Sequence, residues 1–243
     1  KNPQMLMWPA DKYDFKSIAD IGKSPAKVLY FQGNTYMDYL VAQKLLRADQ
    51  IDGSYDGKPD RFVAAGNVVQ QGFATNEPYY YEHVDDPFGI KPWRGKKISY
   101  LLIYDAGYQP YQAIAVRPQV LEEKRACLKR LVPMIQRAQV AFARDPAPMS
   151  AAFDRITREL GQHWRISEKG ASHAAKLMVE LGIIGGGPDA TIGNFNDARV
   201  KKMIEIVSPI YERAKKPIKA GLTEKDVVTN EFIDATVSLT APK

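Results

Sequence analysis

The sequence predicts an α/β fold in its first half and an all-helical second half. Up to about residue 116, short β-rich runs alternate with segments of helical spacing, which is typical of a mostly parallel sheet covered by helices. From residue 120 onward the apolar residues recur at helical spacing alone. With 243 residues, 45% of them hydrophobic, the chain is long enough to bury a sizeable core without disulfides.

The first half contains the predicted strands and three predicted helices. The β-rich runs cover residues 5–8, 27–32, 98–104 and 112–116, and residues 61–65 form either a further strand or the start of a helix. Helices are expected over residues 17–23, 35–45 and 67–72. Asn34 or Thr35 is the natural N-cap of the second helix, so this region has the order strand, glycine-containing turn, helix.

The second half is expected to hold five helices. Apolar spacing places four of them at residues 120–143, 153–164, 174–181 and 200–210. Gly182 is the expected C′ residue of the third, and a capping-box spacing at Thr223 starts the fifth. An interior proline costs a helix about 3 kcal/mol, so we expect Pro133 to kink or divide the first helix and Pro209 to break the fourth.

Charge and cysteine content exclude several classes of protein. The net charge of +6 is divided as +1 over residues 1–119 and +5 over residues 120–243, without a run of five like charges, so a solvated basic helical face is favoured over nucleic-acid binding. Cys127 is the only cysteine, which excludes an internal disulfide and a cysteine-based zinc site, and its apolar neighbours predict that it is buried. No apolar run reaches the roughly 20 residues of a membrane span.

Two turns and a loop carry the candidate binding chemistry. The turn of Gly33, Asn34 and Thr35 joins a strand to a helix, where free N–H groups and the helix dipole favour an anionic or polar group; an ordinary helix cap is the alternative. Residues 105–108 follow the clearest strand and therefore lie at its carboxyl end, where ligands of α/β sheets bind. A simple turn with Asp105 at its first position explains that loop equally well.

Residues 70–82 are too polar for a core element and too aromatic for a random loop. Thr75, Asn76 and Glu77 offer hydrogen-bond donors and acceptors, and the tyrosines at residues 79–81 suit stacking on a planar solute. The alternative is that Glu77 caps a helix and the tyrosines pack under the loop that follows.

Catalytic and metal motifs are missing from the sequence. His83, His163 and His173 have no histidine or cysteine at metal-ligand spacing, so surface or capping roles are favoured for all three. The sequence contains neither a G-x-S-x-G elbow nor a Walker A motif, and no nucleophile and base are paired by spacing.

Several of these segments resemble one protein family. Residues 17–23, the strand–turn–helix around Gly33, and residues 71–79, 105–108, 193–200 and 229–233 resemble segments of periplasmic substrate-binding proteins of ABC transporters. The particular resemblance is to the group that binds thiamine-pyrimidine precursors, nitrate, taurine and alkanesulfonates. It implies a type II fold of two α/β lobes with the solute in the cleft between them.

The resemblance also implies an organisation of the chain. Residues 1–16 would be the end of a first lobe, residues 17–116 the second lobe, and residues 117–243 helices that return to the first lobe. Family members normally begin with a signal or lipid anchor and most of the first lobe, and Lys1 is not followed by such a segment here, so a processed or truncated N-terminus is expected.

The function that the resemblance implies is capture of a small organic solute, pyrimidine-like or a sulfonate or carboxylate, and its delivery to a membrane permease. The protein would be a monomer that is periplasmic, or extracellular and anchored to the membrane through a lost N-terminus. It would use no metal or cofactor and would not transform its ligand. The ligand-binding residues carried over from the family are Gly33, Asn34, Thr35, Gln71, Thr75, Asn76, Glu77, Asp105 and Tyr108. The alternative is a thiamine-pyrimidine synthase of the same fold, which uses pyridoxal phosphate, iron and a cysteine-rich motif; the single cysteine argues against it.

Overall fold

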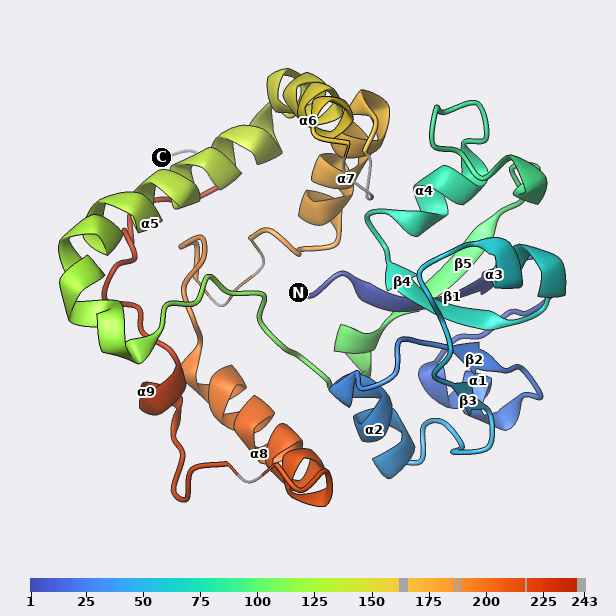
Figure 1. The fold of residues 1–243 in the computed structure, drawn as a ribbon, viewed down its shortest axis with the longest axis horizontal. Helices are drawn as coiled ribbons and strands as arrows, with labels where there is room; N and C mark the ends of the chain where they lie inside the picture. Colours follow the sequence, from blue (N-terminus) through green and yellow to red (C-terminus); the bar gives the residue numbers. More distant parts are fainter. Residues whose placement is uncertain (162–165, 186, 188, 217, 240–243) are drawn as a thin grey trace.

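The computed structural model describes residues 1–161, 166–185, 187, 189–216 and 218–239. Figure 1 shows an α/β half, on the right, and a helical half that extends away from it on the left. The described residues of the first half form one mixed five-stranded sheet. Its strands, in spatial order, are β3 (Ile51–Asp52), β2 (Val28–Leu29), β4 (Val69–Phe73), β1 (Gln4–Pro9) and β5 (Ile98–Leu102).

The strand directions bring the chain's main turns to one edge of the sheet. β2 is parallel to both β3 and β4, whereas β1 is antiparallel to β4 and β5. Four strands therefore end at the same edge, and β1 begins there. The chain builds first from β2 to β3 and then crosses to β4 on the other side of β2, so the switch in strand order lies between β2 and β4.

Helices cover both faces of this sheet. The α/β half contains α1 (Ile18–Lys23), α2 (Thr35–Ala42), α3 (Asp60–Ala65) and α4 (Glu77–Glu82), with 3₁₀ turns η1 (Lys91–Trp93), η2 (Ile103–Ala106) and η3 (Pro118–Val120). The capping box of Ser17 and Asp20 fixes the start of α1, because each side chain accepts a hydrogen bond from the other residue's backbone N–H.

The core has two parts, one on each face, and β1 supplies both. Leu6 and Trp8 enter the part that contains α1 and α2, while Met5 and Met7 enter the part that contains α3 and α4. Alternation along a strand produces this division, because successive side chains point to opposite faces. All four side chains are buried, so β1 is covered on both sides.

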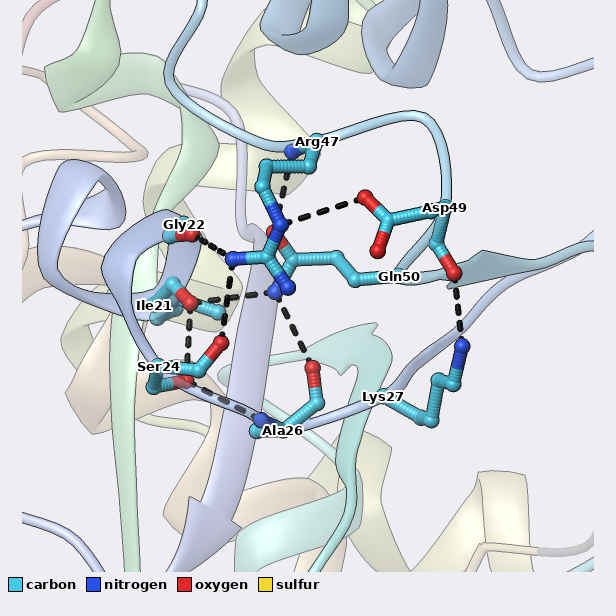
Figure 2. A network of polar contacts seen from close by, with 8 residues as sticks. All are labelled: Ile21, Gly22, Ser24, Ala26, Lys27, Arg47, Asp49 and Gln50. Atoms are coloured by element: carbon cyan, nitrogen blue, oxygen red, sulfur yellow. Dashed lines mark hydrogen bonds and ion pairs between the residues drawn. The ribbon is translucent and has the colours of Figure 1, made fainter.

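A buried amide ties the loop after α2 to the turn after α1 (Figure 2). Gln50 is 1% exposed; its Nε2 donates to the carbonyl oxygens of Ile21 and Ala26, each at 3.0 Å, and its Oε1 accepts from the N–H of Arg47 at 2.9 Å. The guanidinium of Arg47 donates to the carbonyl oxygens of Gly22 and Ser24. Four backbone carbonyls of this turn are thereby paired by two side chains.

The helical half consists of α5 (Leu121–Arg144), α6 (Ala147–Glu159), α7 (Glu168–Glu180), α8 (Asp197–Arg213) and α9 (Glu224–Val227). The expected capping box at Thr223 and the left-handed Gly182 after α7 are confirmed. None of the helices that the structure describes combines the length and apolar character that a bilayer crossing requires.

The expected division of the first helix at Pro133 and the break of the fourth at Pro209 are wrong, whereas a kink at Pro133 remains a prediction. Pro133 lies inside a continuous α5 and Pro209 inside a continuous α8. An interior proline removes one backbone hydrogen bond, and the turns on both sides of it remain helical here. Cys127 is exposed on α5, contrary to expectation.

The structure decides three further expectations, for residues 67–72, 61–65 and 112–116. Residues 67–72 were expected to be helical but contribute to β4, where hydrogen bonds to β2 and β1 on both sides override local preference. Residues 61–65 belong to helix α3. Residues 112–116 form no strand; Ile114 is 67% exposed, and this segment has no neighbouring strand to pair with.

We predict that Gln50→Ala lowers the free energy of unfolding by roughly 2–4 kcal/mol, because it leaves buried backbone carbonyls without donors. Urea denaturation monitored by circular dichroism measures the change. Lys27→Ala is the control, since the exposed Lys27 ammonium also donates to a nearby carbonyl, that of Asp49, and its loss should cost less than about 0.5 kcal/mol. Equal effects of the two substitutions would contradict the role given to Gln50.

Candidate functional site

The turn between β2 and α2 lies at the carboxyl edge of the sheet. Gly33 adopts a φ of 89°, a left-handed conformation that favours glycine, and Asn34 is the N-cap residue, as expected. The Asn34 side chain does not cap the helix. Its Nδ2 instead donates to Oε1 of Gln71 at 3.1 Å, which joins this turn to β4.

The side chain of Gln71 joins the end of β4 to the turn that follows β2. Its side chain is buried, and its Oε1 accepts hydrogen bonds from the N–H of Phe31 at 2.9 Å, from Asn34 and from the hydroxyl of Tyr36. A backbone N–H can only donate, so the bond from Phe31 fixes which end of the amide faces the turn. Burial raises the pKa of Tyr36 well above its usual range, so this phenol stays protonated and donates.

The loop after β5 reaches the same turn through Tyr108. Its hydroxyl is hydrogen-bonded to Oγ1 of Thr35, the first residue of α2. Tyr39, one turn further along α2, donates its hydroxyl to the carbonyl of Ala106 at 3.0 Å. The structure thus brings together five of the nine predicted site residues, which are Gly33, Asn34, Thr35, Gln71 and Tyr108.

The turn between β4 and α4 places Thr75, Asn76 and Glu77 at the same edge but beside the opposite face. Oε2 of Glu77 accepts from the N–H of Phe73 at 2.7 Å, and its carboxyl packs on Gly72, where a Cβ atom would lie 2.9 Å from its Cδ. Gly72 and Gln71 are successive residues of β4, so Glu77 and the Gln71 amide are separated by the sheet. Burial raises the pKa of Glu77.

Asp105 lies at the same edge of the sheet but, in the described part of the chain, is not joined to the cluster around Gln71. It lies in η2, after β5, and its exposed carboxylate pairs with the ammonium of Lys1 at 3.2 Å. No contact joins it to Gln71 or to the turn after β2 within the described residues, so its expected role in binding remains a prediction.

The tyrosines at residues 79–81 do not form the stacking surface that the sequence suggested. All three are buried, and Tyr81 packs edge-on against Phe62 and Trp93 in the core. Helix α4 turns Tyr81 toward the sheet, and Phe88 of the following loop packs on Tyr80. The alternative of tyrosines packed beneath the following loop is therefore correct.

Two of these tyrosines anchor the helical half. Ser167, the N-cap of α7, donates its backbone N–H to the hydroxyl of Tyr80 at 3.1 Å and its own hydroxyl to Asp86 at 2.6 Å. The hydroxyl of Tyr79 also donates to Asp86, at 3.3 Å. A Cβ at Gly170 would lie 2.3 Å from the Tyr80 hydroxyl, so this junction requires a glycine at that position.

Exposed aromatic rings do occur at the edge, at positions that sequence reasoning missed. Phe31 follows β2 and is 37% exposed; Phe73 ends β4 and is 36% exposed. The Phe31 ring packs on Tyr55 with centroids 4.8 Å apart. Both phenylalanines flank the segments chosen from the sequence, and the signal that distinguishes them is their position at the carboxyl ends of neighbouring strands.

A hollow of about 480 Å³ lies elsewhere, in the helical half beside Lys1. Residues that end or follow α7 line much of it, including Leu181 and Ile184, together with Leu239. No predicted site residue lines it. The described residues also contain no group of three or more acidic, histidine or cysteine side chains arranged to hold a metal ion.

Comparison with models of protein families finds no match to this chain, and a search of curated protein sequences finds no significant relative. The function must therefore be argued from the edge of the sheet. What this edge offers chemically is a set of neutral hydrogen-bond donors beside exposed aromatic rings.

Two histidines that are distant in sequence meet at the junction of α4 and α7. The ring of His83 stacks on Tyr79 with centroids 4.2 Å apart, and His173 of α7 lies against the same tyrosine at 4.9 Å. The His83 and His173 centroids are 6.3 Å apart. Burial, and secondarily His83, lowers the pKa of His173. His163 lies outside the described residues.

We predict that His173 makes the protein less stable as the pH falls below about 6.5, the pKa of an unperturbed histidine. Its pKa is lower in the folded chain, so the unfolded chain binds more protons at acid pH and stability is lost there. His173→Asn should therefore flatten the dependence of the melting temperature on pH between 7 and 5. A wild-type and a variant profile of equal slope would contradict this.

Proposed function

We propose that this chain is the solute-binding component of an ABC importer. It binds a small organic solute at the carboxyl edge of the sheet without transforming it, and delivers it to a membrane permease. The observation that carries the binding proposal is the hydrogen-bonded cluster of Asn34, Gln71, Thr35 and Tyr108. It lies where the strand order switches between β2 and β4, the position at which open α/β sheets bind their ligands.

The arrangement of this cluster suits binding rather than chemistry. Its side chains are amides and hydroxyls held in place for a ligand by hydrogen bonds to one another and to the backbone of Phe31. Of the carboxyls nearby, that of Glu77 faces the other side of the sheet and bonds to the backbone of Phe73, and that of Asp38, in the first turn of α2, is exposed to solvent. Neutral groups held in this way can select a solute by its shape and its hydrogen-bond pattern.

The transport role rests on the resemblance of the strand–turn–helix at Gly33 and the later segments to ABC-transporter binding proteins. The proposal therefore includes a permease as partner, a periplasmic location and a type II two-lobe fold. The α/β half and the helical half meet through α4 with α7 and through α2 with α8. Arg199 of α8 adds hydrogen bonds to the carbonyl oxygens of Gln109 and Pro110.

We predict that a panel of pyrimidines, sulfonates and carboxylates contains at least one compound that raises the melting temperature of the protein. A ligand at 100 times its Kd stabilises the folded state by about 2.7 kcal/mol, a shift of several degrees. Thr35→Val should reduce the shift at equal ligand concentration, because it removes the hydroxyl that bonds to Tyr108. Thr157→Val is the matched control, because Thr157 lies on α6 in the helical half.

Two results would contradict the proposal. One is a panel in which every compound leaves the melting temperature unchanged. The other is steady conversion of a bound compound to product by the purified protein, followed by chromatography, which would indicate an enzyme instead.

A further inference from the structure

The edge presents an unused hydrogen-bond donor at Gln71. Its Oε1 accepts three hydrogen bonds, whereas its Nε2 makes none to the residues that the structure describes. Among the described residues, two side-chain polar atoms are fully buried and have no hydrogen-bond partner, Gln70 Oε1 and Tyr81 OH. Gln71 Nε2 is not one of them although it has no partner there, so this atom is accessible to solvent. The side chain as a whole is 97% buried, because its exposed fraction is 3%. This amide, at the carboxyl end of β4, therefore has two N–H donors that no described residue uses.

The first turn of α2 adds donors at the same place. Asn34 bonds to Gln71 rather than capping α2, so the N–H groups of Thr35 and Tyr36 have no side-chain cap. Amide N–H groups and a helix N-terminus favour an oxyanion. The carboxyl of Glu77 does not oppose this, since it is on the other face and burial raises its pKa toward the neutral form. Asp38, in the first turn of α2, is exposed, so solvent and salt screen its charge.

An apolar, aromatic surface adjoins these donors. Phe73 is two residues after Gln71 on β4 and so emerges on the same face, at the edge itself. The ring of Phe31 turns to the other face, where it packs on Tyr55, whose hydroxyl accepts a hydrogen bond from Gln70. Phe73 is 36% exposed. An exposed ring beside fixed polar donors suits a ligand with a flat apolar part.

From this juxtaposition we infer that the solute is a small aromatic acid, an aryl carboxylate or aryl sulfonate. Its oxyanion accepts hydrogen bonds from Nε2 of Gln71 and from the first N–H groups of α2. Its ring lies against Phe73 at the edge of the sheet. The inference rests on the proposed solute-binding function and narrows its ligand class.

Isothermal titration calorimetry with ligands that differ in one property tests this. Benzoate and benzenesulfonate have both the ring and the charge. Cyclohexanecarboxylate keeps the charge and the carbon count but loses planarity, benzamide keeps the ring without the charge, and acetate keeps only the charge. We expect the two aryl acids to bind at least tenfold more tightly than the other three, since ring stacking and a charge-assisted hydrogen bond each contribute about that factor.

Three substitutions separate the two parts of the site. Phe73→Ala should weaken benzoate about tenfold and leave acetate unchanged, whereas Phe153→Ala should change neither; Phe153 is a matched control, since it is 38% exposed on α6. Gln71→Glu keeps an oxygen to accept from Phe31 but replaces the Nε2 donors with an anionic oxygen. It should abolish benzoate binding, with circular dichroism confirming that the variant is folded.

The outcomes distinguish this inference from the proposed function. If cyclohexanecarboxylate or acetate binds as tightly as benzoate, or if Phe73→Ala and Phe153→Ala behave alike, the aromatic acid is wrong while solute binding stands. If another member of the wider panel binds and the aryl acids do not, the aromatic acid is again the wrong ligand class while solute binding stands. If no compound of either panel binds, the proposed function fails as well.

Discussion

The covering of β1 on both faces is the constraint on which the rest of the α/β half depends. Because it is buried between β4 and β5 and supplies both parts of the core, its alternating side chains decide which helices lie on which face. Its register with β4 pairs Leu6 with Gln71. That pairing turns the Gln71 amide toward α2 and leaves Gly72 facing α4. The chemistry of each face at the binding edge is therefore set by the packing of one hydrophobic strand.

Local sequence signals predicted the elements that they specify directly. Residues 98–102 of the β-rich run at 98–104, the turn at Gly33 and the capping box at Thr223 lie in the expected kind of structure, whereas residues 103–104 belong to η2. β4 was mistaken for a helix because its glutamines and Gly72 have little strand preference, and only its neighbours on both sides stabilise it as a strand. Propensity cannot show such long-range pairing.

The candidate site was predictable to a similar degree. The residues of the two turns were found because their types and their positions after strands are visible in the sequence, and Gln71 joins Asn34 as that reasoning required. The tyrosines of α4 misled because an aromatic run looks the same whether it faces a solute or a neighbouring helix. Their burial follows from the packing of α7 on α4, a contact between residues 87 positions apart in the chain. Phe31 and Phe73 stand out only once their strand ends are placed side by side.

The exposed position of Cys127 gives this molecule a built-in attachment point. It is the only thiol in the sequence, and it lies on α5, in the half that meets the sheet through α7 and α8. A fluorescent maleimide therefore reacts at one place without any engineered cysteine. A second label placed at the rim of the sheet would make the distance between the two halves observable in solution, molecule by molecule, before and after a solute is added.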